Sequence, residues 1–150
     1  DLDLSAIVDN ILNIYREKIK EKKLKLNVDI QKKLPQLKGE RFKIEQMFIN
    51  LLDNAVKYTE EGHISIKISH NKKEGEIDIR VSNTGLPIPE KSLPRIFERF
   101  YVVDKSRSRK LGGTGLGLSI VKHVVILHKG DISAENSEED GTVFKIQLPL

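Results

Sequence analysis

Three polar side chains fall on one face of a helix predicted for residues 41–58. Asn50 and Asn54 lie four residues apart and Lys57 follows three residues later, which is the spacing of neighbours on a helix surface. Carboxamide oxygens are hard ligands that suit Mg²⁺, an ion that keeps several waters and bridges to substrate phosphates. A nearby ammonium group suits a polyphosphate. The alternative is an ordinary exposed polar stripe, and a second feature of the chain weighs against it.

That second feature is a glycine-rich segment, Gly112 to Leu118, which runs directly into an apolar stretch typical of a helix. Glycines let backbone N–H groups approach phosphate oxygens, because a Cβ would block both the tight turn and the approach. The first turn of the helix adds unpaired donors and the positive end of its dipole. Four cations precede it in the segment Lys105–Lys110, which either closes on a terminal phosphate or remains a solvated loop.

Two further segments between these features contain candidate site residues. Asn83 directly follows a predicted strand and precedes a sharp break at Gly85, so its amide could read the edge of a base at the floor of a pocket. A plain turn is the alternative. Residues 96–101 could form a short amphipathic helix, in which core packing is the favoured role of Phe97 and Phe100.

Other phosphate-binding and catalytic patterns do not match the sequence. There is no G-x-x-x-x-G-K-[ST] motif, and the glycines follow a basic loop and not a strand, which disfavours a dinucleotide-binding unit. The H-R-D and D-F-G elements of protein kinases are absent. Without cysteine, disulfides, thiol catalysis and thiolate metal sites are excluded. The four histidines lack metal-ligand spacing, and His123 and His128 are expected to pack or to cap.

Size and composition indicate one soluble globular domain, residues 1–150. The net charge is +4, but acidic residues are interspersed among the cations of positions 16–33 and few aromatics accompany them. A solvated surface is therefore favoured over a nucleic-acid interface. No apolar run approaches a membrane span, so no direct membrane contact is expected. The chain begins with Asp1, which suggests part of a longer protein.

Hydrophobic periodicity predicts helices and strands in an order that fits an α/β sandwich, with helices over one face of a mixed sheet. Ser5 is the predicted N-cap of the first helix. A long irregular stretch in a compact domain usually forms a functional lid. The expected elements are helix 5–22, strand 24–30, helix 41–58, strands 63–69 and 76–82 around a hairpin turn, a lid over 83–115 with a helical patch near 93–100, helix 116–128, and strands 131–137 and 142–148.

Taken together, the motifs resemble those of the catalytic, ATP-binding domain of sensor histidine kinases. The wider family includes gyrase, a heat-shock chaperone and a mismatch-repair ATPase. Asn50–Tyr58 is similar to the N box, Asn83–Ile88 to the first glycine box, Ile96–Tyr101 to the F box, and Gly113–Gly117 to the second glycine box. The resemblance implies the two-layer Bergerat fold, with ATP between the N-box helix and a mobile lid.

The resemblance also implies roles for individual residues. Asn54 would ligate Mg²⁺, while Lys57 and Tyr58 would contact phosphate and ribose. Asn50 and Lys57 are the candidate catalytic residues. The ATP-binding set implied in this way comprises Asn50, Asn54, Lys57, Tyr58, Asn83, Gly85, Pro87, Ile88, Phe97, Phe100, Tyr101, Lys105, Arg107, Arg109, Gly113, Thr114, Gly115, Leu116, Gly117 and Leu118.

The sequence departs from the family pattern at three positions. Asn83 stands where the family has Asp, Pro87 replaces a glycine, and Val102 replaces an arginine, so phosphate contact would fall to Lys105, Arg107 or Arg109. These departures leave a degenerate nucleotide-binding regulatory module as an alternative function. A gyrase-type ATPase is disfavoured, because Asn50 occupies the position of the hydrolytic Glu and an amide cannot act as a general base.

The resemblance implies transfer of the γ-phosphoryl group of Mg·ATP to a histidine on a separate domain, in two-component signalling. No phosphoacceptor motif occurs in the sequence, so the dimerisation and phosphoacceptor domain is expected upstream. The implied partners are ATP or ADP, the protein's own dimerisation and histidine phosphotransfer domain, and a response regulator that acts through the full-length kinase. The expected location is the cytoplasm, and this includes the cytoplasmic portion of a membrane-bound sensor.

Overall fold

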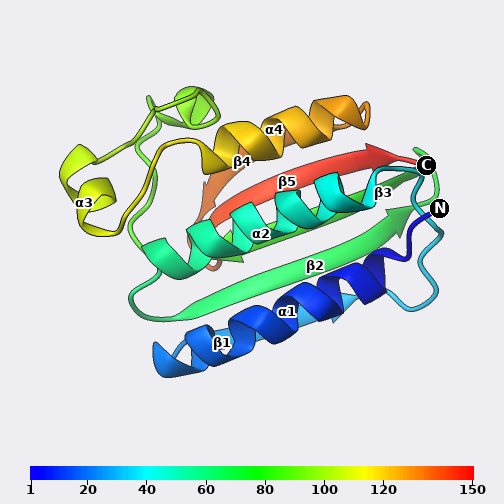
Figure 1. Ribbon diagram of the computed structural model, residues 1–150, viewed down its shortest axis with the longest axis horizontal. Coiled ribbons are helices and arrows are strands. Elements are labelled where there is room, and N and C mark those ends of the chain that lie inside the picture. Colours follow the sequence, from blue (N-terminus) through cyan, green and yellow to red (C-terminus); the bar gives the residue numbers. More distant parts are fainter.

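The computed structural model describes residues 1–150 and consists of helices laid on one face of a five-stranded sheet (Figure 1). Three long helices, α1, α2 and α4, run along the sheet, while two short ones belong to the lid. In chain order the elements are α1 (Leu4–Glu21), β1 (Lys25–Ile30), α2 (Arg41–Tyr58), β2 (His63–Asn71), β3 (Glu76–Asn83), the 3₁₀ turn η1 (Leu93–Arg95), α3 (Lys105–Lys110), α4 (Gly117–Leu127), β4 (Asp131–Ser137) and β5 (Gly141–Pro149).

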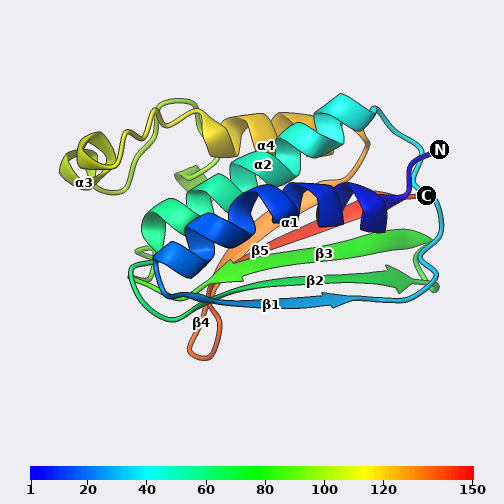
Figure 2. The same cartoon turned by 60° about the horizontal axis from the view of Figure 1, so that its bottom comes forward.

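The sheet has the strand order β1-β2-β3-β5-β4, so β1 and β4 are its edges. The pair β1–β2 is parallel and all other pairs are antiparallel. Figure 2 shows the three long helices together on one side of this sheet. The predicted fold class, an α/β sandwich with a mixed sheet and helices on one face, is confirmed.

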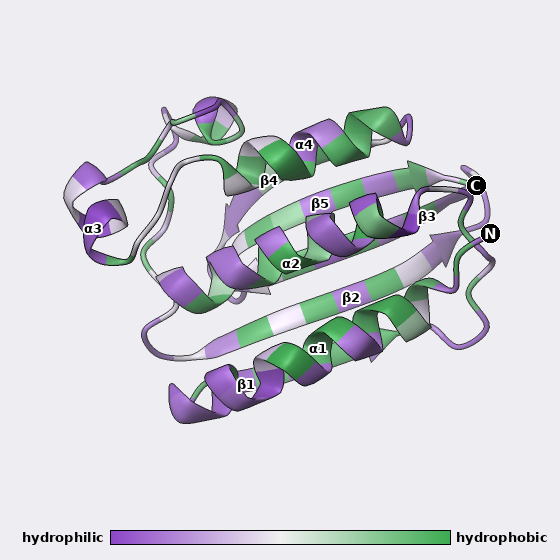
Figure 3. Cartoon of the chain, in the orientation of Figure 1, coloured by the Kyte–Doolittle hydropathy of each residue, from purple (hydrophilic) through white to green (hydrophobic).

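The core lies between the helices and the sheet, and alternation along the strands builds it. Ile66 of β2 is directly opposite Val81 of β3, and Ile68 is opposite Ile79; all four side chains are buried. Figure 3 shows the same alternation of apolar and polar residues along the strands. Phe48 of α2 is fully buried against this layer. Because side chains in a strand alternate between faces, one face is apolar and the opposite face is polar.

Two details differ from the sequence predictions. Helix α1 is capped by Asp3, whose carboxylate accepts a hydrogen bond from the Ala6 backbone N–H at 3.1 Å. The predicted N-cap, Ser5, lies within the first turn instead, because Leu4 already belongs to the buried face of the helix. Strand β1 is less buried than its alternation suggested, since it is an edge strand and Val28 remains 38% exposed.

His128 connects the end of α4 to the start of α2. Its Nδ1 lies 2.8 Å from the Val124 carbonyl oxygen, and its Nε2 accepts a hydrogen bond from the Glu40 backbone N–H at 3.1 Å. Glu40 is the N-cap of α2 and makes no side-chain cap of its own, so the imidazole satisfies one of the orphan donors there. The predicted capping role is found for His128, whereas His123 is exposed on the outer side of α4.

Replacing His128 with alanine should lower the free energy of unfolding by about 0.5–1.5 kcal/mol, because the Glu40 N–H loses its partner, whereas the Val124 carbonyl still accepts from the backbone N–H of residue 128 at 3.1 Å. The matched control is His123→Ala on the same helix, which should change stability by less than about 0.5 kcal/mol. Urea unfolding of both variants measures the difference. Equal losses would show that the contacts of His128 with Val124 and Glu40 contribute nothing specific.

Candidate functional site

A cavity of about 720 Å³ opens between α2, the lid and the start of α4, above the ends of β3 and β5. In Figure 1 the lid extends beyond the ends of α2 and α4 and carries α3 at its tip. The cavity is lined by residues that are far apart in the sequence: Asn50, Asp53, Asn54, Lys57, Tyr58, Asn83, Leu86, Pro87, Ile88, Pro89, Ile96, Tyr101, Val102, Val103, Asp104, Arg107, Gly113, Thr114, Gly115, Leu116, Gly117, Leu118, Ile120, Thr142 and Phe144.

One wall of the cavity is the polar face of α2. The Asn50 amide nitrogen donates to the Gln46 carbonyl oxygen at 2.9 Å, which leaves its Oδ1 as the free acceptor. That oxygen points toward the start of α4, since a Cβ on Gly117 would lie 3.3 Å from it. Asn54 lies one turn further along the same wall. Two carboxamides therefore share the cavity with the N-terminus of α4.

Lys57 belongs to the same wall and is held there by a carboxylate that the sequence analysis did not select. Its Nζ lies 3.3 Å from Asp53 Oδ2, an i,i+4 ion pair with both side chains partly exposed. Asp53 also accepts from the Tyr15 hydroxyl of α1 at 3.5 Å. Burial of Tyr15, with the Asp53 charge second, raises the pKa of that phenol to about 12, so it remains a donor at neutral pH. Asp53 thus positions Lys57 at the cavity wall.

The opposite wall is the glycine-rich segment, which packs too closely for larger residues. A Cβ on Gly113 would lie 2.4 Å from Ser108 Oγ. Gly115 has φ +74, and a Cβ there would lie 2.8 Å from the Cα of Phe100. The Gly115 carbonyl accepts from the Phe100 backbone N–H at 2.9 Å. The segment delivers α4 to the cavity with its N-terminus, where unpaired N–H groups favour an anion.

The basic segment of the lid is a helix, α3, and not the loop predicted from its sequence. Asp104 caps it by accepting from the Arg107 backbone N–H at 3.1 Å. Arg107 lines the cavity, with its guanidinium 5.7 Å from the Tyr58 ring and Nη2 3.4 Å from Glu60 Oε1. Lys105 and Arg109 lie two residues away on either side, and therefore on the opposite side of the helix, where both are exposed.

Asn83 lies at the floor of the cavity, only 6% exposed, at the end of β3. Its Nδ2 is 3.5 Å from the Thr84 carbonyl, a marginal hydrogen bond. Thr142 of β5 is directly opposite Asn83, also 6% exposed, and lines the same floor. The floor therefore presents an amide and a hydroxyl, both of which can donate or accept hydrogen bonds.

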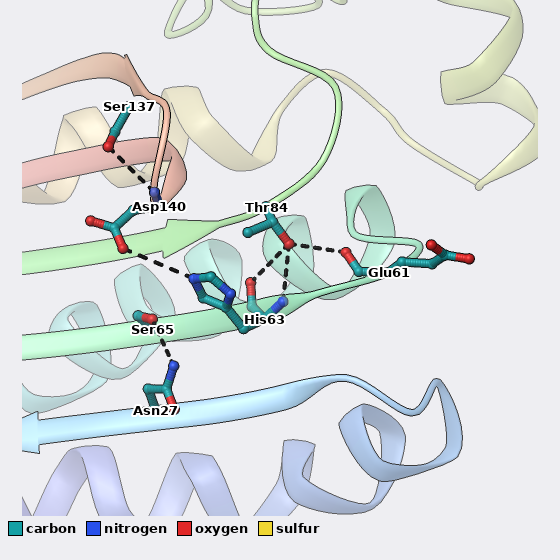
Figure 4. A network of polar contacts seen from close by, with 7 residues as sticks. All are labelled: Asn27, Glu61, His63, Ser65, Thr84, Ser137 and Asp140. Atoms are coloured by element: carbon teal, nitrogen blue, oxygen red, sulfur yellow. Dashed lines mark hydrogen bonds and ion pairs between the residues drawn. The ribbon is translucent and has the colours of Figure 1, made fainter.

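The sheet end next to Asn83 is fixed by a network of polar contacts (Figure 4). The Thr84 hydroxyl donates to the Glu61 carbonyl at 2.9 Å and accepts from the His63 backbone N–H at 3.0 Å. His63 Nε2 lies 3.9 Å from Asp140 Oδ1, which joins the start of β2 to the β4–β5 turn. These contacts hold the strand end from which Asn83 projects.

The lid begins with a clamp between Ile88 and the sheet. The Ile88 backbone N–H donates to Asn136 Oδ1 at 3.1 Å, and the Asn136 amide donates back to the Ile88 carbonyl at 2.7 Å. Pro87 lies beside this clamp and lines the cavity together with Ile88. Pro87, which replaces a glycine of the family pattern, is thus compatible with a lid whose first residues are anchored to β4.

Some residues of the predicted ATP-binding set lie outside the cavity lining. They are Gly85, Phe97, Phe100, Lys105 and Arg109. Residues 96–101 are not helical, because the helical patch stops at η1, and Phe100 has φ +63 with its side chain 70% exposed. Core packing of Phe100 is therefore wrong, whereas Phe97 packs edge-to-face against Phe144 with ring centroids 6.2 Å apart.

Several residues that line the cavity were not predicted from the sequence. Thr142 and Phe144 come from β5, far along the chain, and no local signal marked them. Asp53 could have been found from its i,i+4 spacing to Lys57, and Asp104 from its capping distance to Arg107. Val102 also lines the cavity, so this position supplies no cation.

An open mixed sheet under helices, with carboxamides and cations facing a glycine-rich helix start, defines a nucleotide-binding domain of the α/β-sandwich class. The family described as histidine kinase-, DNA gyrase B-, and HSP90-like ATPases matches residues 39–150. The chain belongs to this family, and the resemblance seen in its four motifs is confirmed.

Sequence relatives of this chain are sensor kinases. It is 47% identical over 108 residues to the sensor histidine kinase WalK of Bacillus subtilis, covering 71% of this chain and 18% of that protein. It is 36% identical over 149 residues to the sensor protein kinase WalK of Staphylococcus aureus, covering 99% of this chain and 35% of that protein. The chain therefore spans only a minor part of the length of these relatives.

Solved structures lead to the same class. The nucleotide-free catalytic domain of the histidine kinase ThkA superposes with a TM-score of 0.86 at 30% identity, covering 99% of this chain and 93% of that one. ThkA in complex with the response regulator protein TrrA gives a TM-score of 0.82 at 28% identity, with coverage of 99% and 40%. Among the helices described here, none combines the length and apolarity that crossing a bilayer requires.

Proposed function

We propose that residues 1–150 form a single catalytic domain that binds Mg·ATP in the cavity and donates the γ-phosphoryl group to a histidine on a separate dimerisation domain. The observation that carries this proposal is the meeting of the α2 polar face with the glycine-rich start of α4 in one cavity. Lys57 and Arg107 add cations from both sides of that cavity. Positioning and charge stabilisation are what phosphoryl transfer requires of a protein.

The residues present fit a magnesium ion that is shared with the nucleotide. Asn54 is the proposed ligand, because its carboxamide lines the cavity beside Asn50. No group of three or more histidine or carboxylate side chains gathers in the structure to hold a metal alone, so phosphate oxygens and water would complete the coordination. When bound, Mg²⁺ would neutralise part of the phosphate charge.

Each wall of the cavity has a proposed task. Lys57 and Tyr58 contact phosphate and ribose, and the backbone of Gly113 to Leu118 surrounds the phosphates. Asn50 contributes an amide oxygen, which cannot remove a proton from water, so bound ATP would not be hydrolysed quickly. This disfavours a gyrase-type ATPase. The departures at Asn83 and Val102 keep a degenerate regulatory module as the second candidate.

The proposed partners follow from this chemistry. The domain would receive ATP and release ADP, and its acceptor histidine would lie on a dimerisation and histidine phosphotransfer domain of the same protein. A response regulator would act through the full-length kinase, a proposal supported by the ThkA–TrrA complex of a relative. We place the domain in the cytoplasm, as part of a sensor protein like its relatives.

The isolated chain should bind ATP but neither label itself nor turn ATP over appreciably. Adding a separate dimerisation domain with its acceptor histidine should restore transfer in trans, though weakly, because the effective concentration given by tethering is lost. Labelling with γ-phosphate-radiolabelled ATP measures both reactions. Stable labelling of this chain on any of its four histidines would contradict the proposal. ATP binding without any transfer would favour the regulatory module.

Losing the Arg107 and Arg109 side chains together should weaken ATP binding more than ADP binding, because the γ-phosphate is the difference between these ligands. A hydrogen bond to a charged group contributes about 1.5–3 kcal/mol, so an ATP-specific loss of roughly tenfold or more is expected. Arg107→Ala alone should reproduce this ATP-specific loss. Arg109→Ala is the matched control, because Arg109 lies outside the cavity lining. Equal losses for both nucleotides would show that these cations are only solvated.

A further inference from the structure

A second, shallower groove lies between α1 and the edge strand β1, on the far side of α2 from the lid. Its volume is about 370 Å³. Ile19, Leu24 and Leu26 form an apolar floor, and three cations, Arg16, Lys20 and Lys23, line the rim. Figure 2 shows α1 lying above β1 at this margin of the sheet.

The rim cations have no partner that explains their clustering. None of the ion pairs in the structure includes Arg16, Lys20 or Lys23. Arg16 and Lys20 are an i,i+4 pair of like charge, which destabilises a helix. The helix dipole favours Lys20 in the last turn, but Arg16 lies a turn earlier and Lys23 lies beyond the end of α1. No carboxylate lines the groove.

The floor of the groove adjoins a row of unpaired backbone groups. The Lys25 N–H donates to the Gly62 carbonyl at 3.0 Å and the Gln31 N–H to the Ile68 carbonyl at 2.9 Å. In a parallel ladder, alternate residues of a strand bond to the same neighbour, so the odd-numbered residues of β1 face β2. The N–H and C=O groups of Leu26, Val28 and Ile30 therefore point outward, at an edge with no further strand.

We propose that this edge and groove together bind an extended acidic segment of a partner protein, which pairs with β1 as an additional strand. Side chains of an added strand alternate between the two faces of the sheet, so every second one would enter the groove below α1. Carboxylates there would reach Arg16 and Lys20, and an apolar side chain would cover Leu26, which is only half-buried. Backbone pairing supplies affinity and the groove supplies specificity.

An extended peptide matches all three observations, whereas other anions match only one. A nucleic acid or an anionic membrane would engage the rim cations but would leave the half-buried Leu26 and the outward backbone groups without partners. Charge complementarity selects an acidic segment, because a basic one would face three unpaired cations.

The test is an NMR titration of the chain with an amide-blocked peptide of sequence Thr-Glu-Thr-Ile-Thr-Glu-Thr. Its Glu and Ile residues face one side of a strand, so together they can enter the groove. We expect shifts and slowed hydrogen exchange at the Leu26, Val28 and Ile30 amides. The double variant Arg16→Glu, Lys20→Glu should weaken binding about tenfold or more. The double variant Lys72→Glu, Lys73→Glu, with the same change in charge at the exposed β2–β3 turn, should bind as the unaltered chain does.

A second probe tests strand addition without altering the protein. The same peptide, N-methylated at two consecutive central residues so that neither of its edges can pair with β1, keeps its charges, and its binding should be lost. Unchanged binding of the methylated peptide would overturn the proposal, as would equal losses in the two charge-reversed variants. Shifts of these amides by an oligothymidylate or by phosphatidylglycerol vesicles, with none from the peptide, would replace the proposed occupant by an anion of that class.

Discussion

Replacing Asn54 with alanine should abolish Mg²⁺-assisted ATP binding and leave the fold intact. Asn54 lines the cavity from the polar face of α2, while the buried residues of the helix lie on its other side. Removing a carboxamide at this position deletes the proposed magnesium ligand without creating a void in the core. The effect should be confined to the metal-dependent part of the affinity, because the remaining cavity residues still contact the nucleotide.

Calorimetric titration with ATP, in the presence and absence of Mg²⁺, separates these contributions. The matched control is Gln46→Ala, which removes a carboxamide side chain from an exposed position of the same helix. Circular dichroism and urea unfolding should show both variants folded. Unchanged affinity of Asn54→Ala for Mg·ATP would remove Asn54 from the metal site.

Replacing Asn83 with leucine should remove most of the binding of both ATP and GTP. Asn83 is 6% exposed at the cavity floor, and leucine would leave the base edge without a polar partner there. Asn83→Asp should instead sharpen the preference for ATP. A carboxylate only accepts, as the adenine amino group requires, whereas the amide can turn and donate to the guanine O6.

The size of the Asn83→Asp effect follows from hydrogen-bond energies. Bonds to charged groups contribute about 1.5–3 kcal/mol and neutral ones about 0.5–1.5 kcal/mol, so the gain for ATP should be roughly 1 kcal/mol, or several-fold in affinity. Competition titrations with ATP and GTP on both proteins measure the ratio. Equal or better ATP selectivity in the unaltered chain would show that the amide is locked, or that Asn83 does not contact the base.

The regular part of the fold was predictable because its signals are local and periodic. Helix α2 begins and ends where its apolar pattern predicted, since Ile44, Phe48 and Leu51 repeat at helical spacing without an interrupting proline. The alternation of β2 and β3 likewise predicted a hairpin with one buried face. Periodicity does not report which strand is an edge, and this is why the exposure of Val28 was missed.

The lid was predictable only in outline, because its structure depends on contacts outside the segment. The run Lys105–Lys110 has no apolar periodicity, so α3 could have been found only from the capping position of Asp104. Phe100 is an apolar residue of the type found in protein cores. Its backbone hydrogen bond to Gly115 and its positive φ nevertheless turn the side chain outward. Arg107 lines the cavity, whereas Lys105 and Arg109 do not. Which cation of α3 faces the cavity likewise depends on how the helix is oriented in the three-dimensional structure.

The two hydrogen bonds between Ile88 and Asn136 mark the boundary between two parts of the molecule that have different roles. They tie the first residues of the lid to β4, whereas beyond them residues 89–115 carry few buried side chains. Segments with little burial open at a lower free energy than the core does. For the proposed nucleotide site, we therefore expect residues 89–115 to govern the rate at which a nucleotide enters and leaves, and the sheet and the three long helices to govern the lifetime of the folded domain. Substitutions within residues 89–115 would then change the exchange of nucleotide while leaving the stability of the domain unaltered.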